Sequence, residues 1–262
     1  MKITEKKAST ACSPSKLPGL DWALNPYRGC QHACVYCYSP DILHLGKEEE
    51  WGSAVEVKKN LPVLLAKGKK KITGPIGLGT VTDPYQPVED ETFLTRFCLE
   101  QLVSSSVCIQ TKGDIILRDL DILKRIKNLE VGITITTMDQ ETARILEPGA
   151  PPPENRIKAL AKLSKEGIRT WVFLGPVIPG INDSYDSLGK VIKAAKEAGA
   201  GKIIYDKLRL KPLVRQRMEK KFGLSKASKM FQLAEDREWV ERVFIDIEVL
   251  CDDAGLVGEK AF

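Results

Sequence analysis

The chain has 262 residues, of which 43% are hydrophobic and 29% are charged, and its net charge is +5. These proportions are ordinary for a soluble globular protein, and no apolar run is long enough to span a bilayer. The first ten residues lack the apolar core of a signal peptide, so we expect a cytoplasmic protein that does not associate with membranes.

The first third of the chain is irregular. Residues 1–20 are polar and contain several turn residues, which predicts an extended N-terminal arm. A short strand within residues 21–27 is expected to lead into a cysteine-rich loop. Beyond the loop, we expect a short helix at 41–50, a strand at 55–57 and a helix at 61–71 that ends in a basic run.

From residue 76 the pattern alternates between strands and helices. Strands are expected at 76–81, 107–111, 131–137, 169–174 and 202–205. Helices are expected at 91–103, 119–127, 154–165, 187–198, 225–233 and 235–254, with Phe93, Phe97 and Leu102 of the first facing inward. Gly167 and Gly199 are expected to end two of these helices.

This alternation is typical of a parallel sheet covered by helices. About six strand–helix units are present, fewer than in a closed eight-fold barrel. We therefore expect three parts, namely an arm (residues 1–20), an α/β core domain (residues 21–211) and a C-terminal helical extension (residues 212–262).

Three of the seven cysteines form a C-x3-C-x2-C pattern at Cys30, Cys34 and Cys37. Such close thiolates can converge on one soft metal centre, either an iron–sulfur cluster or a zinc ion with His32 as the fourth ligand. The odd number of cysteines indicates a reducing compartment. We expect Cys98 and Cys108 to be core residues, whereas Cys12 and Cys251 are candidates for a hydrogen-atom donor or an extra ligand.

The cysteine pattern, with an aromatic residue before its last cysteine, resembles the signature of the radical S-adenosylmethionine (SAM) superfamily. Four further motifs are similar to those of spore-photolyase-related proteins. They are NPYRGCQHACVYCY (residues 25–38), TDPYQPVE (residues 82–89), TK (residues 111–112) and LEP (residues 146–148). The resemblance implies a partial (β/α)6 barrel of the TIM type. It also implies a [4Fe–4S] cluster on Cys30, Cys34 and Cys37, with SAM bound to the open iron and cleaved to a 5′-deoxyadenosyl radical.

Several polar residues fall at the expected carboxyl ends of strands, where parallel α/β folds bind ligands. From their chemistry and the resemblance, we expect Asp83 and Lys112 to meet the ammonium and carboxylate groups of SAM. Thr134 and Thr136 are expected at the ribose, and Tyr36 and Ile178 at the adenine. Thr82, in the same turn as Asp83, is also expected to bind SAM. No catalytic residue is assigned.

The resemblance weakens at one position. Spore photolyase carries a hydrogen-donating cysteine where this chain has Thr80, so photoproduct repair by the same route is doubtful. The mildly basic charge favours a DNA, RNA or nucleotide substrate. The alternatives are a protein side chain or small metabolite as the substrate, or a non-catalytic iron–sulfur or zinc protein. We also expect an electron donor such as ferredoxin or flavodoxin.

Overall fold

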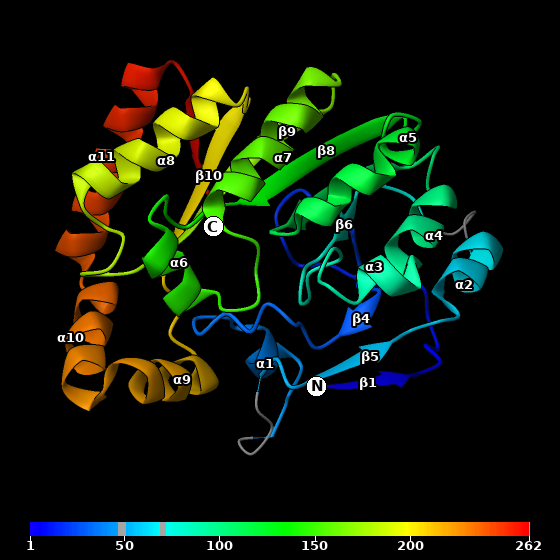
Figure 1. The fold of residues 1–262 in the computed structure, drawn as a ribbon, viewed down its shortest axis with the longest axis horizontal. Coiled ribbons are helices and arrows are strands. Elements are labelled where there is room, and N and C mark those ends of the chain that lie inside the picture. Colours follow the sequence, from blue (N-terminus) through cyan, green and yellow to red (C-terminus); the bar gives the residue numbers. More distant parts are fainter. Residues whose placement is uncertain (47–50, 69–71, 262) are drawn as a thin grey trace.

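The computed structural model describes residues 1–46, 51–68 and 72–261. A curved, mostly parallel sheet forms an incomplete barrel, and helices cover its outer side (Figure 1). Within the described ranges this sheet has eight strands in the order β11-β10-β9-β8-β7-β6-β3-β2. In chain order they are β2 (Ser13–Pro14), β3 (Trp22–Leu24), β6 (Ile76–Leu78), β7 (Ser106–Thr111), β8 (Asn128–Thr134), β9 (Arg169–Val177), β10 (Lys202–Lys207) and β11 (Val257–Lys260).

The six neighbouring strands from β3 to β10 are all parallel, which confirms the expected partial barrel of the (β/α)6 type. Two edge strands extend it. β11 adds a parallel strand beside β10, and β2 pairs antiparallel with β3. The sequence analysis did not predict β11.

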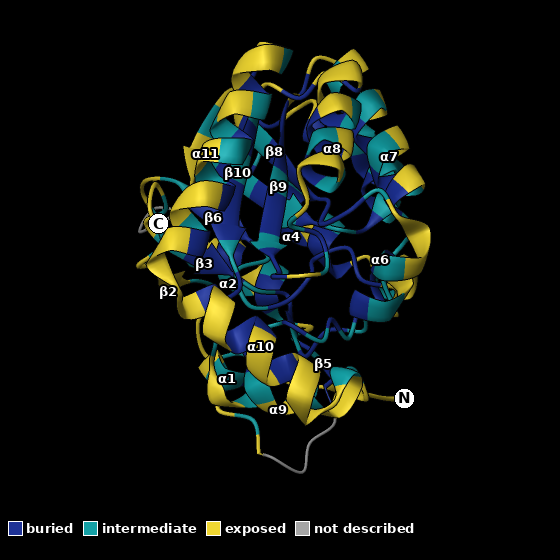
Figure 2. Cartoon of the chain, turned by 90° about the vertical axis from the view of Figure 1, so that its left-hand side faces the viewer, coloured by how far each residue is buried: buried dark blue, intermediate teal, exposed yellow. Residues whose placement is uncertain are grey.

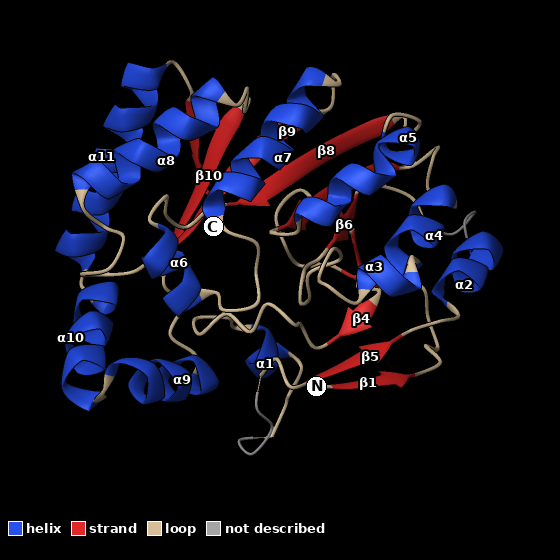
Figure 3. Ribbon diagram, viewed as in Figure 1, coloured by secondary structure: helices blue, strands red, loops and turns tan. Residues whose placement is uncertain are grey.

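The helices, drawn in blue in Figure 3, mostly lie outside the sheet. They are α1 (Ser39–Ile42), α2 (Leu61–Gly68), α3 (Glu89–Thr92), α4 (Leu94–Glu100), α5 (Leu120–Leu123) after a 3-10 turn (Asp114–Asp119), α6 (Gln140–Leu146), α7 (Pro153–Lys165), α8 (Tyr185–Glu197), α9 (Pro212–Phe222), α10 (Leu224–Glu235) and α11 (Arg237–Ala254). Gly167 and Gly199 follow α7 and α8 with φ of +80° and +83°, as expected for helix ends. None of the helices in the described part of the chain has the length and apolarity that a bilayer crossing requires.

A second, small sheet was not expected. It contains β1 (Lys2–Glu5), β5 (Ala54–Val57) and β4 (Tyr27–Arg28) in the order β1-β5-β4. The strand predicted within residues 21–27 is therefore split between two sheets. Pro26 stands at the break, where a residue without a backbone N–H cannot continue a ladder. The cysteine loop leaves from β4 of the small sheet.

Three predicted helices differ from the structure, and the one expected at 119–127 is shortened to α5 (Leu120–Leu123). The helix expected at 91–103 is broken at Phe93, which adopts φ +51°, so Phe93 and Phe97 are 38% and 46% exposed instead of facing inward. The left-handed residue changes the phase of the helix, and Leu94 and Cys98 are buried in their place. The helix expected at 41–50 is the single turn α1, and residues 47–50 and 69–71 of the predicted helices lie outside the described ranges.

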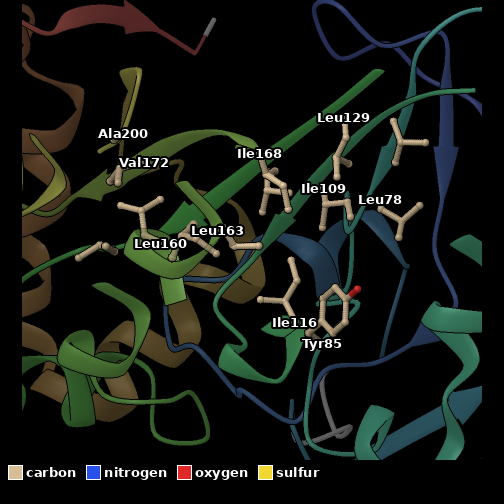
Figure 4. Packing of buried hydrophobic residues seen from close by; sticks show 14 of the residues in the cluster. Leu78, Tyr85, Ile109, Ile116, Leu129, Leu160, Leu163, Ile168, Val172 and Ala200 are labelled. Atoms are coloured by element: carbon tan, nitrogen blue, oxygen red, sulfur yellow. The ribbon is translucent and has the colours of Figure 1, made fainter. Parts of the chain in front are cut away.

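The two faces of the sheet have different roles. Ile109 and Val172 belong to the hydrophobic core between the strands and the outer helices, part of which Figure 4 shows. Because side chains alternate along a strand, their neighbours Cys108 and Trp171 face the interior instead. The core therefore supports the barrel from outside and leaves the interior free for a binding site.

Candidate functional site

A cavity of about 680 Å³ lies on the inner side of the curved sheet. It extends from the cysteine loop over the inner side chains of β7, β8, β9 and β10. Of the ten residues expected in the site, eight line it, namely Cys30, Cys34, Tyr36, Cys37, Thr82, Asp83, Lys112 and Thr134. The fold thus brings together residues from four separate parts of the chain, as the positions of the strand ends indicated.

The cysteine loop is shaped by short turns. The backbone N–H of Ala33 donates to the carbonyl of Cys30 (3.3 Å), and that of Cys37 donates to the carbonyl of Cys34 (3.2 Å). Gly29, just before the loop, has φ +93°, and a Cβ there would lie 2.3 Å from the carbonyl oxygen of Ala54. The loop can therefore approach the small sheet this closely only with glycine at that position.

The segment after α6 runs beside the cysteine loop. Val35 donates its N–H to the carbonyl of Leu146 (2.9 Å), and Gly149 donates to the carbonyl of His32 (3.0 Å). A Cβ on Gly149 would lie 2.0 Å from the carbonyl oxygen of Gln31, so this contact also requires glycine. These bonds hold the LEP motif (residues 146–148) directly against the cysteine loop.

Asp83 links the cysteine loop to the strand ends. Its Oδ1 accepts hydrogen bonds from the hydroxyl of Thr111 (2.5 Å) and the N–H of Tyr85 (2.9 Å), and its Oδ2 accepts one from the N–H of Lys112 (2.8 Å). Nδ1 of His32 lies 3.2 Å from the same Oδ2. Burial alone would raise the pKa of Asp83, but His32 and the hydrogen bonds outweigh it and lower this pKa to about 2.

Glu147, to which the sequence analysis gave no role, is a second buried carboxylate beside the loop. It accepts hydrogen bonds from the hydroxyls of Tyr36 and Thr136, the latter at 3.1 Å. Nη1 of Arg156 lies 2.5 Å from its Oε2, and Nζ of Lys112 lies 3.9 Å from its Oε1. Burial opposes its charge, yet Arg156 and Lys112 lower its pKa. In the sequence, the only signal for Glu147 is its place in the LEP motif.

The remaining predicted residues differ in position. Thr82 lines the cavity and donates its hydroxyl to the carbonyl of Gly29 (2.6 Å). Thr134 lines it too and accepts a weak hydrogen bond from Gln110 (3.4 Å). Thr136 and Ile178 do not line this cavity in the described structure, because Thr136 is turned to Glu147 and Ile178 is fully buried.

The thiols are placed to hold an iron–sulfur cluster. Cys30, Cys34 and Cys37 share one cavity. A [4Fe–4S] cluster takes each thiolate on a different iron, so three thiolates of one short loop can bind it together. Nε2 of His32 is buried and has no hydrogen-bond partner among the described residues, as expected beside a bound group.

Burial opposes the loss of the Cys30 and Cys34 protons. Burial raises the pKa of Cys34 to about 12, with Lys112 partly opposing it, and raises that of Cys30 well above its usual range. Cluster binding must therefore displace protons from this loop, which makes it pH-dependent.

The C-terminal helices also hold the cysteine loop, a contact that the sequence analysis missed. Arg217 of α9 donates from Nε to the carbonyl of Val35 (3.3 Å) and from Nη2 to the carbonyl of Cys37. Asp41 of α1 accepts the N–H of Leu213 at the start of α9 (3.0 Å). The C-terminal extension is thus part of the site.

Two aromatic rings on β9 line the far part of the cavity. Trp171 and Phe173 meet edge to face, with ring centroids 6.5 Å apart. Space for each ring comes from a glycine. A Cβ would lie 2.3 Å from a ring atom of Trp171 if added to Gly132, and 2.6 Å from one of Phe173 if added to Gly175.

The other thiols differ in whether they line the cavity. Cys108 lines the cavity, whereas Cys12 and Cys251 do not. Cys251 is fully buried in α11, with its Sγ close to Gly258 of β11. Neither position supports the expectation that these two cysteines supply an extra ligand or a hydrogen atom.

The chain is similar in sequence to known proteins. The model of the radical SAM superfamily matches residues 24–199. An uncharacterised protein of Methanocaldococcus jannaschii is 38% identical over 184 residues, which cover 70% of each chain. A radical SAM Nα-GlyT isomerase of Pseudomonas phage M6 is 24% identical over 210 residues, covering 76% of this chain and 42% of that one.

Solved structures share the fold. A mutant of spore photoproduct lyase with bound AdoMet and dinucleoside spore photoproduct gives a TM-score of 0.76 at 14% identity. The match covers 99% of this chain and 82% of that one. The expected relationship to spore photolyase is thereby confirmed at the level of the fold.

Proposed function

This chain belongs to the radical SAM superfamily, and we propose that it acts on a base of a nucleic acid or nucleotide held in the barrel cavity. Enzymes of this superfamily use a [4Fe–4S] cluster and SAM. When bound, the reduced cluster supplies the electron that cleaves SAM into methionine and a 5′-deoxyadenosyl radical. An electron carrier such as ferredoxin or flavodoxin is part of the proposal.

Cys30, Cys34 and Cys37 would hold the cluster, and Lys112 would meet the carboxylate of SAM. Two observations support the second role. Lys112 lines the cavity with the thiols, and Cys34 and Glu147 raise its pKa against the effect of burial, so its ammonium stays charged. Such a fixed cation is suited to a carboxylate ligand.

Asp83 would position the site instead of binding SAM directly. A carboxylate has about four acceptor sites, and four neighbouring groups already surround this one. By holding His32 and the backbone of Lys112, it would keep the cysteine loop and the strand ends aligned. Thr134 and Tyr36, which line the same cavity, remain candidates for the SAM ribose and adenine, whereas Thr136 and Ile178 would support the site from behind.

The proposal of a base as the substrate rests on one observation, namely that Trp171 and Phe173 share a cavity with the three thiols. Aromatic rings are the usual platform for unstacked bases. Gln110 lines the same cavity and offers an amide to the polar edge of a base. Spore photoproduct lyase, which shares the fold, binds a dinucleoside in its solved complex.

We do not extend photoproduct repair to this chain. The hydroxyl of Thr80, at the place of the donor cysteine, exchanges hydrogen bonds with Asn25 at 2.9 and 3.3 Å. An O–H bond is too strong to give up its hydrogen atom readily. A modification in which the base radical is resolved in another way fits this site better.

The test measures whether the hydrogen atom that the 5′-deoxyadenosyl radical removes comes from a base. The protein is reconstituted anaerobically, reduced with dithionite, and given SAM with an oligonucleotide deuterated in its bases. We expect methionine and 5′-deoxyadenosine, and deuterium from the base in the 5′-deoxyadenosine. Cys34→Ala is the control without a complete cluster site.

Three results would contradict the proposal. Zinc in place of iron would remove the radical chemistry altogether. 5′-Deoxyadenosine that never acquires deuterium from DNA, RNA or nucleotides would remove the nucleic-acid substrate. Deuterium acquired from a labelled peptide or metabolite instead would identify the alternative substrate class.

A further inference from the structure

Positive charge is concentrated in two stretches of the chain. Residues 58–71 contain six Lys residues and no acidic residue, and the larger stretch is residues 207–229. Residues 207–229 contain nine Lys or Arg residues and one Glu, a net charge of +8. The other 239 residues contain 31 Lys or Arg and 34 Asp or Glu, a net charge of −3. The modest overall charge of +5 therefore hides a strongly basic segment, which we call the basic hairpin (residues 207–229).

The basic hairpin begins at the cavity and leads outward. Lys207 and Arg209, at the end of β10, both line the cavity wall. The chain then forms α9, which lies beside α1, and enters α10, which packs against α9 (Figure 1). Val214 and Met218 of α9 belong to the same buried cluster as Cys34, so the hairpin is fixed against the cysteine loop.

The outer side of the basic hairpin is open to solvent. Lys211, Lys221, Lys226 and Lys229 are exposed, and Figure 2 shows α9 and α10 mostly in the colour of exposed residues. Two arginines of the hairpin have acidic partners outside it, Arg209 with Asp206 and Arg215 with Glu235. With these two carboxylates included, the net charge of the surface is still +6.

We propose that the basic hairpin binds the phosphodiester backbone of a polynucleotide while one base of that chain occupies the cavity. This inference rests on the proposed function and specifies a polymer, DNA or RNA, instead of a free nucleotide. Clustered lysines and arginines are the main source of sequence-independent affinity for nucleic acids. The 11 residues of α9 extend about 16 Å, which at 3.4 Å per nucleotide corresponds to about five phosphates.

An acidic electron carrier is the main rival for the same surface, because α9 also lies against the cysteine loop. The continuity of charge favours the polynucleotide. Lys207 and Arg209 extend the positive surface into the wall of the cavity, where the substrate enters but an electron carrier does not. A polymer can follow this path from the surface to the reacting base.

The test compares two matched sets of charge removals in the reconstituted full-length protein. Lys211→Gln/Lys221→Gln/Lys229→Gln changes the basic hairpin. Lys158→Gln/Lys165→Gln/Lys193→Gln removes three exposed lysines from α7 and α8. Binding of fluorescent single-stranded DNA, duplex DNA and single-stranded RNA is measured at several salt concentrations. Iron content and the thermal unfolding midpoint establish that both variants are folded.

We expect the hairpin variant to bind its preferred polymer at least tenfold more weakly at low salt than the control variant does. The slope of log K against log salt should become shallower by about two, since each lost phosphate contact removes roughly 0.7 to 0.9 from it. Comparison of the three polymers shows whether the basic hairpin prefers the backbone of DNA or that of RNA.

Equal binding by the two variants, or no binding of any polymer by the wild type, would overturn the inference. So would a hairpin variant that binds polynucleotides normally but is reduced more slowly by flavodoxin, since the surface would then serve the electron carrier. Deuterium transfer from a labelled dinucleoside, measured separately on the wild type, shows whether the proposed function survives such a result.

Discussion

Arg156 and Glu147 form an ion pair that is almost completely buried, with Nη1 of the arginine 2.5 Å from Oε2 of the glutamate. The pair lies directly behind the cysteine loop, because Glu147 also accepts the hydroxyl of Tyr36. Two further contacts, from Arg156 to the carbonyls of Pro151 and Thr134, fix the guanidinium. The loop that binds the cluster therefore rests on a buried charge network.

Glu147→Gln should lower the free energy of unfolding by about 3 kcal/mol, because breaking one partner of a buried pair leaves the other charge unpaired. Urea unfolding of the reduced protein without the cluster measures this loss. Glu197→Gln, which removes an exposed partner of Lys193, should change the stability little. The double substitution Glu147→Leu/Arg156→Met should recover much of the loss, and a single variant as stable as the wild type would contradict the role of the pair.

Asp83 should make stability depend on acid pH. Its pKa is about 2 in the folded protein and near 3.9 in an unfolded chain, so its charge stabilises the fold above about pH 4. That contribution, on the order of 2.5 kcal/mol at 1.36 kcal/mol per pKa unit, should disappear as the pH falls from 4 towards 2.

Urea unfolding of the reduced protein between pH 6 and pH 2 tests this dependence. Asp83→Asn should be less stable at pH 6 and should show a smaller further loss on acidification. Asp186→Asn, at an exposed carboxylate of α8, should follow the wild type. Parallel pH profiles for Asp83→Asn and the wild type would assign the acid sensitivity to other groups.

Arg217 should control how firmly the cluster is held. Arg217→Met removes the donors to the carbonyls of Val35 and Cys37 and also removes a positive charge beside the thiols. We expect faster release of iron to a chelator under anaerobic conditions. The reduction potential of the cluster should become more negative, because the reduced form loses a stabilising charge.

Arg215→Met is the matched control for Arg217→Met. Arg215 lies on the same helix but pairs with Glu235 and stacks on Phe231, away from the cysteine loop. Its iron release and potential should equal those of the wild type. If both variants behave alike, the effect belongs to the packing of α9 and not to the contact with the loop.

Much of the barrel was predictable because strand and helix periodicity are local. Strands such as β7 and β9, and helices such as α7, were expected within a few residues of their observed bounds. The break at Phe93 was not, since a left-handed residue leaves no mark on an apolar pattern. The small sheet was missed for a different reason, because β1 and β5 are about 50 residues apart and pair only in the folded chain.

The residues of the site also differ in how far they could be predicted from the sequence. The cysteines, Asp83 and Lys112 could be found because their spacing or their place at strand ends is visible along the chain. Arg156 and Arg217 could not, because a charged residue on a helix is normally exposed. Their roles depend on partners that are distant in sequence, and Arg217 lies 180 residues from Cys37 along the chain.

Gly132 should determine the shape of the substrate cavity. Gly132→Ala would place a Cβ 2.3 Å from the ring of Trp171, so the indole must move within the cavity. We expect KM for the nucleic-acid substrate to rise several-fold, measured through deuterium transfer to 5′-deoxyadenosine. Gly189→Ala, whose Cβ would meet Leu250 of α11 at an ordinary 3.4 Å, is the control and should leave KM unchanged. An unchanged KM in Gly132→Ala would show that the substrate does not reach the Trp171 ring, and the base would then bind nearer to Thr134.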